Sequence, residues 1–396
     1  MHIVIVALHR PMKPTGVCRH AANLARCLAE QPEVTKISLI IGSWQQHYFE
    51  TAFDLNFPKV KLVAVNIKNS SIVRNLWFVV DLPKLANELQ ADVVHLSFPL
   101  PFIRRKFNAS VVTTIHDLYP YECPENFGFP KVWFNRMFLR QAIKNSNGLP
   151  CVSRLTADRL QLYFPNLKSW QKVDVIYNYV DFEGIEIEAP SQIAEDSRFF
   201  LCVAQHRRNK NLDLLIKAFH RLLTSQKIEP DCQLIIIGST GPETDKIKNL
   251  ITELDLETKI KLLSGLSDRQ LCWLYRHCLT FVIPSAAEGF CLPLAEALHF
   301  SDRVVCSDIP IFREIATDKC TYFSLKGDAV AQLEDAVAKT LVRPGSLDRD
   351  YLQRFNKSNI AQQYLNLYSW IDSQEIQTFP KEQSTIINAL ANSMEK

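Results

Sequence analysis

Short apolar runs alternate with segments of helical periodicity along most of the chain. In the first half, seven runs rich in β-branched residues are each long enough for one buried strand: 3–8, 37–41, 60–65, 93–96, 111–115, 148–152 and 173–176. Segments with helical spacing lie between them, such as 18–30 and 83–89. This rhythm predicts a parallel sheet with helices on both faces.

The same rhythm restarts in the second half. Strand-like runs at 199–203, 233–237, 260–262, 280–283 and 303–306 alternate with helical patterns at 212–223, 246–254, 268–277 and 293–299. The segment 181–197 between the two series is acidic, contains Pro190 and has no clear period, which is typical of a linker. We therefore expect two doubly wound α/β domains of the Rossmann-like type, at 1–181 and 182–350, followed by C-terminal helices at 351–396.

The stretch from Tyr351 to Trp370 has apolar residues at helical spacing. This pattern predicts a helix with a long apolar face that packs back across both domains. The alternative is a helix that caps only the second domain.

Residues 288–298 carry the most informative chemistry in the chain. They follow the apolar run 280–283, and Pro293 stands where a helix would begin. A helix start exposes unpaired backbone N–H groups and the positive end of the helix dipole, so the loop from Gly289 to Leu292 is a natural seat for phosphate oxygens. Glu296, expected in the first helical turn, is suited to bind ribose hydroxyls, and Glu288 to bind the hydroxyls of a group attached to the diphosphate. The alternative makes Glu296 a partner of the helix dipole and Glu288 a solvated loop acid.

Composition narrows the class of protein. Hydrophobic residues make up 47% and charged residues 22%, which is ordinary for a soluble globular protein. The 11 cysteines form no Cys-x-x-Cys pair and lie within apolar runs, so we expect small core residues of a reduced compartment. The apolar N-terminus lacks the features of a signal peptide, and no window has the length of a membrane-spanning helix. We therefore expect a cytoplasmic protein, and the alternative is a protein that also contacts the inner face of the membrane peripherally.

Charge is distributed unevenly. Residues 1–180 contain 21 Lys and Arg against 12 Asp and Glu, whereas the whole chain has a net charge of +3. The basic first half is suited either to an anionic acceptor or membrane surface, or to simple solvation of its helices. Nucleic acid is not an expected partner, because the chain has no nucleic-acid-binding motif and a pI near 8.2.

Two common nucleotide motifs are absent. No Gly-x-Gly-x-x-Gly follows the first strand, which argues against a dehydrogenase, and the phosphate-binding lysine loop of nucleotide hydrolases is missing. The Asp348-Arg349-Asp350 sequence has the acid pair of a divalent-metal site, but its position before a helix favours a capping role.

Several segments together resemble the retaining glycosyltransferases of the GT-B fold. Residues 284–298 resemble their Glu-x7-Glu signature, 15–20 the loop after the first strand, 114–118 a His-Asp segment, and 151–154 a serine loop. Residues 203–212 resemble the donor-site strand with its basic loop, and 263–268 the turn that binds the base. The chain departs from the family pattern at Thr15, Tyr179 and Ala204, where glycine is common, and at Gln205, where a basic residue is common.

The resemblance implies roles for particular residues. His116, Arg207, Lys210 and Glu288 would be catalytic, and the donor-binding residues would be Gly16, Arg208, Gly265, Leu266, Gly289, Phe290, Cys291, Leu292 and Glu296. Either Arg207 or Arg208 would contact the diphosphate, and we favour Arg207. Arg207 and Lys210 would stabilise the leaving phosphates, so neither a cofactor nor a metal ion would be required.

The resemblance also implies the reaction. A hexose would be transferred, with retained anomeric configuration, from a nucleoside-diphosphate sugar to a saccharide, polysaccharide-precursor or lipid-linked saccharide acceptor. The first choice of donor is UDP-glucose or a related UDP-hexose, and the second is GDP-mannose. A sugar-nucleotide epimerase and a non-catalytic nucleotide-sugar-binding protein are the alternatives.

The basic triplet at 104–106 follows the apolar segment 98–103. This juxtaposition suggests that the first domain meets an anionic acceptor at a membrane surface.

Overall fold

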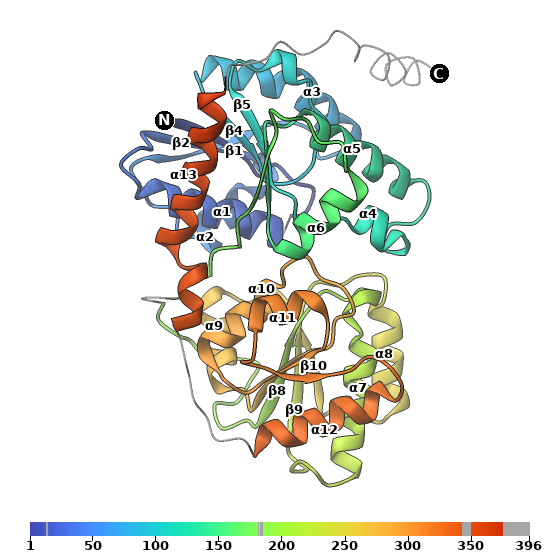
Figure 1. Ribbon diagram of the computed structural model, residues 1–396. Helices are drawn as coiled ribbons and strands as arrows, with labels where there is room; N and C mark the ends of the chain where they lie inside the picture. The colour runs from blue at the N-terminus through green and yellow to red at the C-terminus, as the bar shows by residue number, and fades with distance from the viewer. Residues whose placement is uncertain (13–14, 181, 183–184, 343–349, 375–396) are drawn as a thin grey trace.

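Two parallel sheets, each covered by helices, make up the computed structural model, which describes residues 1–12, 15–180, 182, 185–342 and 350–374. The sheets belong to two domains that lie one above the other in Figure 1, with the first domain uppermost. This architecture confirms the predicted pair of doubly wound α/β domains.

The first sheet has the strand order β3-β2-β1-β4-β5-β6-β7. Its strands are β1 (His2–Val6), β2 (Lys36–Gly42), β3 (Val60–Val65), β4 (Val93–Leu96), β5 (Ser110–Thr113), β6 (Gly148–Cys151) and β7 (Lys172–Val175). Along β1, Ile3 and Ile5 join a core beneath α1 (Gly16–Ala29), whereas Val4 and Val6 join a core beneath α3 (Ser71–Glu88). Both faces of the sheet are therefore buried, as parallel sheets require.

The remaining helices of the first domain are α2 (Gln46–Ala52), α4 (Tyr119–Glu122), α5 (Lys131–Asn145) and α6 (Arg154–Tyr163). Helix α3 corrects the expected helix at 83–89, because it begins at Ser71 and continues through Pro83. Ser70 caps its start, accepting a hydrogen bond from the Val73 amide. A proline in a helix leaves the carbonyl four residues earlier without its usual donor, and here the Lys106 ammonium donates to the Val79 carbonyl at 3.3 Å.

The second sheet has the order β10-β9-β8-β11-β12-β13. Its strands are β8 (Phe199–Val203), β9 (Gln233–Ile237), β10 (Ile260–Leu263), β11 (Thr280–Ile283), β12 (Val304–Ser307) and β13 (Thr321–Phe323). Its helices are α7 (Leu212–Thr224), α8 (Thr244–Glu253), α9 (Asp268–His277), α10 (Leu292–Phe300), α11 (Pro310–Ala316) and α12 (Ala329–Leu341). All the predicted strands are present to within two residues, and the short edge strand β13 with α11 and α12 completes the domain beyond the expected elements.

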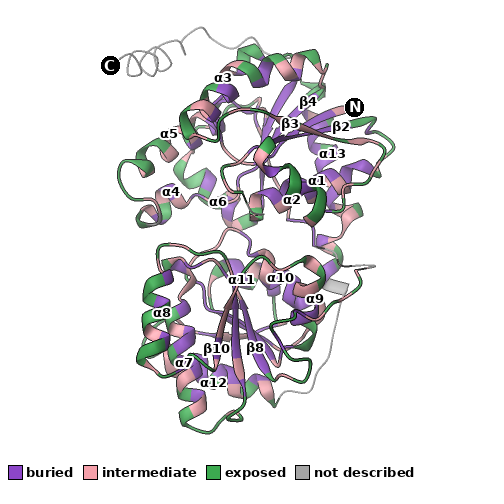
Figure 2. Cartoon of the chain, turned by 180° about the vertical axis from the view of Figure 1, so that it is seen from behind, coloured by how far each residue is buried: buried purple, intermediate pink, exposed green. Residues whose placement is uncertain are grey.

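The last described helix crosses back to the first domain. The 3-10 turn η5 (Asp350–Phe355) places Leu352 and Phe355 in the core of the second domain, and α13 (Lys357–Ser373) buries Tyr364 and Tyr368 in the core of the first. The expected packing across both domains is confirmed. In Figure 2 the buried residues follow the strands and the inner faces of the helices of each domain.

The basic triplet at 104–106 is divided between the core and the surface. Arg104 is only 4% exposed, and it donates to the Asn147 side chain at 2.8 Å and to the Phe107 carbonyl at 2.9 Å. Leu100 and Phe102 of the preceding apolar segment belong to the core between the sheet and α3. Arg104 is therefore part of the packing of the first domain, whereas Arg105 and Lys106 are exposed.

All 11 cysteines are buried and none forms a disulfide, so their expected place in the core is confirmed. Asp348 and Arg349 lie outside the described residues, as does Asp181 of the expected linker. Among the described helices, none has the length and apolar character to cross a membrane.

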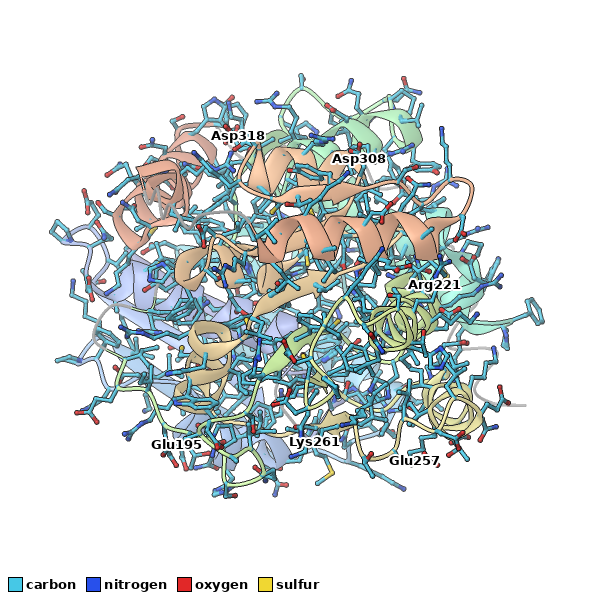
Figure 3. The ribbon with its side chains drawn as sticks, turned by 90° about the horizontal axis from the view of Figure 1, so that it is seen from below. Glu195, Arg221, Glu257, Lys261, Asp308 and Asp318 are labelled. Atoms are coloured by element: carbon cyan, nitrogen blue, oxygen red, sulfur yellow. The ribbon has the colours of Figure 1, made fainter. Side chains whose placement is uncertain are left out.

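The end of the second domain farthest from the first carries charges of both signs. Arg221, labelled in Figure 3, belongs to this surface. It pairs with Glu334 at 2.9 Å, and Lys227 pairs with the same carboxylate at 2.9 Å. This end of the molecule is thus a paired, solvated surface.

Candidate functional site: the cleft between the domains

The loop between β11 and α10 has the strand, loop and helix form expected from the sequence. Helix α10 begins at Leu292 with Pro293 as its second residue, and Cys291 before it adopts a left-handed conformation with φ of 71°. Pro293 has no N–H, and the Leu294 amide donates to the Cys291 carbonyl at 3.1 Å, so the amides that remain for an anion are those of the loop up to Leu292. The loop therefore has the backbone form of an anion seat.

Glu288 in this loop forms a buried ion pair with Lys210. The Lys210 ammonium lies 2.5 Å from a Glu288 carboxylate oxygen, and the two side chains are 17% and 7% exposed. Burial lowers the pKa of Lys210, but the Glu288 charge and other neighbours outweigh it, so the pKa is raised overall and the ammonium stays charged. The alternative of a solvated loop acid is therefore wrong.

Glu296 lies in the second turn of α10, not in the first turn as expected, because the helix begins at Leu292. Its carboxylate is buried and accepts a hydrogen bond from the Tyr275 hydroxyl at 2.8 Å. Burial raises the pKa of Glu296, while the Arg19 charge opposes that rise. A role limited to balancing the helix dipole does not account for a buried, oriented carboxylate.

The basic side chains of the loop at 207–210 have different neighbours. Lys210 reaches Glu288, and the Arg207 charge lowers the pKa of the buried Asp117 carboxyl across the cleft. Burial is the larger effect on Asp117 and raises its pKa to about 6. Arg208 is exposed and lines an open cavity of about 420 Å³ with Cys123 and Glu125 of the first domain. This difference in surroundings favours Arg207 over Arg208 as the residue nearest the reacting groups.

His116 comes from the first domain, just beyond β5. Its Nε2 donates to the Ser97 carbonyl at 2.8 Å, which leaves Nδ1 as the acceptor of a neutral ring. Burial lowers the pKa of His116 to about 4. Asp117 instead holds its own loop, accepting from the Tyr119 amide at 3.0 Å. His116 is thus available as a neutral hydrogen-bonding group.

A buried network of histidines supports His116. The His20 and His116 rings meet edge to face with their centres 4.8 Å apart. The Thr114 hydroxyl lies 3.2 Å from His20 Nε2 and 2.7 Å from His95 Nε2, and His95 Nδ1 pairs with the Tyr368 hydroxyl of α13 at 2.7 Å. Beyond the resemblance of the loop at 15–20, no sequence pattern predicts this network, because its members are far apart along the chain.

The two domains meet at the loop that follows β11. A Cβ atom at Gly289 would lie 1.8 Å from the His116 carbonyl oxygen, so only glycine fits this close approach. The Ser153 hydroxyl donates to the Gly289 carbonyl at 2.7 Å, and the Tyr119 hydroxyl donates to the Ala287 carbonyl at 2.9 Å. Tyr119 escaped sequence reasoning, because an ordinary tyrosine in a loop carries no motif.

At the other end of the cleft, the turn after β10 faces the start of α1. Gly265 has a φ of 75°, a conformation that favours glycine, and partly buried Leu266 packs on the core of the second domain. Arg19 of α1 forms a two-pronged salt bridge with Asp268 at 2.9 and 2.5 Å. Gly16, the first residue of α1, borders open space, since a Cβ atom added there would meet no described atom within 4 Å. The charge of Arg19 thus lies beside both Glu296 and the expected base-binding turn.

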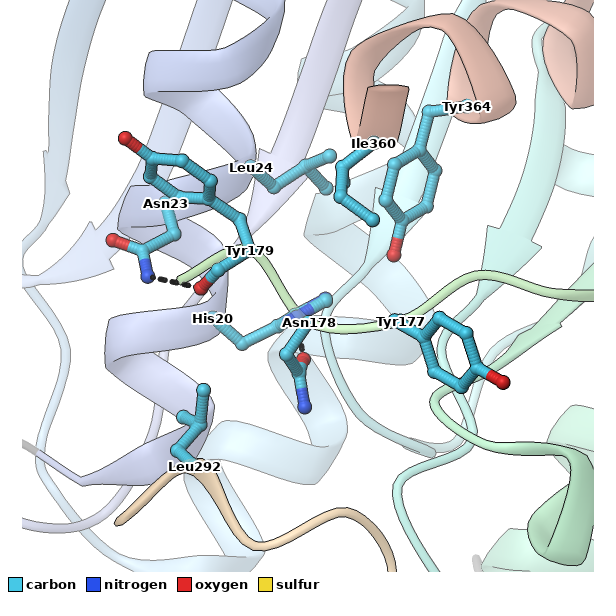
Figure 4. Close-up of a pocket in the computed structure, with 9 residues that line it drawn as sticks. All are labelled: His20, Asn23, Leu24, Tyr177, Asn178, Tyr179, Leu292, Ile360 and Tyr364. Carbon is cyan, nitrogen blue, oxygen red and sulfur yellow. Dashed lines mark hydrogen bonds between the residues drawn. The ribbon is translucent and has the colours of Figure 1, made fainter. Parts of the chain in front are cut away.

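A small pocket of about 10 Å³ lies behind these groups, where α1, α13 and the start of α10 approach one another. Figure 4 shows its lining, including the hydrogen bond from Asn23 to the Tyr179 carbonyl and the pairing of His20 with Asn178. It is lined by His20, Asn23, Leu24, Tyr177, Asn178, Tyr179, Leu292, Ile360 and Tyr364. The pocket separates the histidine network from the seat at α10.

Comparisons with known proteins agree with this arrangement. Residues 14–183 match the family model "Glycosyltransferase Family 4", and residues 185–359 match "Glycosyl transferases group 1". The solved structure of WaaG, a glycosyltransferase involved in lipopolysaccharide biosynthesis, superposes with a TM-score of 0.65 at 17% identity over 94% of this chain and 98% of that chain. Together these findings support the GT-B class of glycosyltransferases for this chain.

Two curated relatives are informative. The O-antigen chain mannosyltransferase RfbU of Salmonella typhimurium is 26% identical over 370 residues, which cover 91% of this chain and 97% of RfbU. A Campylobacter jejuni enzyme is 37% identical over 138 residues, 35% of each chain, and is named N-acetylgalactosamine-N,N'-diacetylbacillosaminyl-diphospho-undecaprenol 4-alpha-N-acetylgalactosaminyltransferase. The chain is thus similar to glycosyltransferases with different sugars.

Proposed function

We propose that the protein is a retaining glycosyltransferase that transfers a hexose from a nucleoside-diphosphate sugar without a metal ion. The observation that carries this proposal is the buried Lys210–Glu288 pair at the start of α10, with the carbonyl of His116 packed against Gly289. It puts a fixed cation, a carboxylate and helix-start amides beside one another, with a neutral imidazole on the adjoining loop. These are the groups that a sugar diphosphate requires.

In this proposal the diphosphate lies on the amides from Gly289 to Leu292, with Arg207 and Lys210 beside it. As the glycosidic bond breaks, negative charge develops on the leaving phosphate, and fixed cations stabilise it more in the transition state than in the ground state. Glu288 accepts hydrogen bonds from sugar hydroxyls, and Nδ1 of His116 accepts one from the opposite domain. The acceptor hydroxyl attacks the face that the diphosphate leaves, and its proton passes to the departing phosphate oxygen.

The nucleoside would lie at the other end of the cleft. Its ribose hydroxyls would donate to Glu296, and its base would lie near Gly265 and Leu266. The sequence favours a UDP-hexose, whereas the similarity to RfbU over most of the chain favours a mannosyl donor such as GDP-mannose. The name of the Campylobacter relative supports a lipid-linked saccharide as one class of acceptor.

Donor binding can be tested by thermal shift with UDP, GDP, ADP and CDP and with their common hexose conjugates. A ligand that binds the native state adds about 2.7 kcal/mol to the unfolding free energy at one hundred times its Kd, and this raises the melting midpoint. We expect one base to give a shift that Glu296→Gln reduces. If no nucleoside diphosphate shifts the midpoint, the proposal is wrong.

Transfer itself needs a second assay. The donor chosen by thermal shift is incubated with and without a lipid-diphosphate-linked saccharide extract. We expect acceptor-dependent release of the nucleoside diphosphate and retained anomeric configuration in the product. Conversion of the donor sugar to its epimer without any acceptor would identify an epimerase instead.

A further inference from the structure

Helix α5 carries an exposed cluster of aromatic side chains that the proposed reaction does not use. Phe129, just before the helix, is 90% exposed, and Trp133 and Phe134 in its first turn are 57% and 38% exposed. The Trp133 and Phe134 rings pack edge to face with their centres 5.1 Å apart. We call these three residues the α5 aromatic surface. Large aromatic rings exposed as a group usually mark a binding surface.

Basic residues accompany this surface. Helix α5 contains Lys131, Arg136, Arg140 and Lys144 and no acidic residue. Helical spacing puts Arg140 and Lys144 on the same side as Trp133, and both are exposed, whereas Leu139, Ala142 and Ile143 on the opposite side are buried. The outward face of α5 thus combines aromatic rings with unbalanced positive charge.

The α5 aromatic surface lies close to the proposed transfer site. Arg136 of α5 donates to the Pro120 carbonyl of α4 at 2.6 Å, and Tyr119, the first residue of α4, donates to the Ala287 carbonyl of the donor loop. Figure 1 shows α4 and α5 side by side on one flank of the first domain. A partner bound here would be held next to the acceptor side of the cleft.

We propose that the α5 aromatic surface docks on an anionic lipid bilayer. Tryptophan and phenylalanine insert at the boundary between head groups and acyl chains, and lysine and arginine are attracted to anionic head groups. An anionic bilayer supplies negative charge uniformly, so it attracts basic side chains spread along the length of α5 wherever they lie. The inference rests on the proposed function in one respect, because it places a lipid-linked acceptor within reach of the site.

The surface differs from the one that the sequence suggested. Arg104 of the triplet at 104–106 is buried, and the preceding residues Leu100 and Phe102 lie in the core, whereas the aromatic rings of α5 are exposed beside Arg140 and Lys144. Another exposed apolar pair, Ile72 at 63% and Leu76 at 53%, lies on α3 of the same domain. This pair offers a matched control for the α5 residues.

Vesicle co-sedimentation of the full chain, without donor or acceptor, tests the proposal. We expect binding to vesicles of phosphatidylcholine with one third phosphatidylglycerol, weak binding to pure phosphatidylcholine, and loss of binding as salt rises. Arg140→Gln with Lys144→Gln should weaken binding by roughly tenfold or more, given the usual attraction per basic residue. Lys248→Gln with Arg276→Gln, an equal charge change on the second domain, should leave it unchanged.

The aromatic residues are tested in the same way. Trp133→Ser with Phe134→Ser should reduce vesicle binding at least tenfold, whereas Ile72→Ser with Leu76→Ser should not. The proposal would be overturned if the α5 substitutions did not reduce vesicle binding, or if the α3 substitutions reduced it equally. Equal binding of the unmodified protein to neutral and anionic vesicles would also overturn it. Donor binding measured by thermal shift in the same variants is a separate readout. Retained donor binding with no vesicle binding would refute only the docking surface, and lost donor binding in the unmodified chain would refute the proposed function.

Discussion

The two halves of the cleft are built from different chemistry. The second domain contributes charged groups on loops, with Lys210 paired to Glu288 and a buried Glu296 on α10. The first domain contributes mainly neutral groups: His20 and His95 are buried, His116 is partly buried, and burial lowers the pKa values of all three. The charged half suits recognition of a diphosphate, and the neutral half suits recognition of uncharged hydroxyl groups.

This difference assigns separate tasks to the two domains. Charges on the second domain should govern the breaking of the glycosidic bond, whereas the first domain should govern the position of the sugar and the stability of its own fold. Arg19, which pairs with Asp268, and the Asp117 carboxyl are exceptions within the neutral half. Burial raises the pKa of Asp117, and the charge of Arg207 from the other domain opposes that rise.

Removal of the Lys210 charge should have the largest effect on turnover. Lys210→Met leaves transition-state charge unstabilised, and we expect turnover to fall by about 100- to 1,000-fold. It also leaves the buried Glu288 carboxylate without its partner, which should cost about 3–5 kcal/mol of unfolding free energy. Single-turnover kinetics and urea unfolding measure the two effects.

A double variant separates catalysis from stability. Lys210→Met combined with Glu288→Met removes both charges, so most of the lost stability should return while turnover remains low. If turnover recovers together with stability, Lys210 has only a structural role.

The neutral half predicts acid sensitivity. A histidine with a pKa near 6.5 when unfolded and about 3 or 4 when folded contributes stability that is present above pH 6.5 and is lost as the pH falls through the folded value. Asp117 acts in the opposite direction, because its raised pKa favours the folded state at low pH. Each of these histidines should contribute about 2 kcal/mol less to the unfolding free energy at pH 5 than at pH 7. Because several histidines act against one carboxyl, we expect the protein to be less stable at pH 5.

His95→Gln checks this explanation, because glutamine keeps hydrogen-bonding groups between Thr114 and Tyr368 but does not titrate. Urea unfolding at pH 7 and pH 5 should show a smaller difference in the variant than in the unmodified protein. An identical difference would mean that His95 does not contribute to acid sensitivity.

Glu296→Gln should weaken donor binding by about tenfold, since a carboxylate accepts hydroxyl hydrogen bonds more strongly than an amide. Tyr275→Phe removes the hydrogen bond that orients Glu296 and should give a smaller loss of the same kind. Calorimetric titration of the donor measures both. Unchanged affinity in a folded Glu296→Gln protein would exclude the ribose role.

The smallest effect concerns the salt bridge between the domains. Arg19→Gln or Asp268→Asn breaks a partly exposed pair, and such pairs contribute about 1 kcal/mol or less. We expect a change of a few-fold in donor affinity with no change in turnover. A large loss of turnover in either variant would show that Arg19 or Asp268 acts in the reaction.

The sequence predicted most of the fold because the strands are local. Each predicted strand is a short apolar run, and its burial on both sides of a parallel sheet leaves little ambiguity. The start of α3 was missed because Pro83 suggested a boundary, while the capping Ser70 lies a dozen residues earlier. Edge strand β13 was missed because only three residues form it.

The candidate site was predictable only in part. The loop at 288–298 could be interpreted locally, since strand, loop and helix are adjacent in the chain. The pairing of His95 with Tyr368, 273 residues apart, depends on the return of α13 to the first domain. The burial of Arg104 within the triplet at 104–106 was not predicted, because burial of one arginine cannot be seen in a charge pattern.

The central claim is that fixed cations of the second domain stabilise the leaving diphosphate. The most direct measurement is the rate of acceptor-dependent nucleoside-diphosphate release from the chosen donor in excess EDTA, compared with the rate in added Mg²⁺ or Mn²⁺. The account predicts equal rates in the unmodified protein and a rate reduced by about 100-fold or more in Lys210→Met under every condition. Loss of activity in EDTA that Mg²⁺ or Mn²⁺ restores would contradict it.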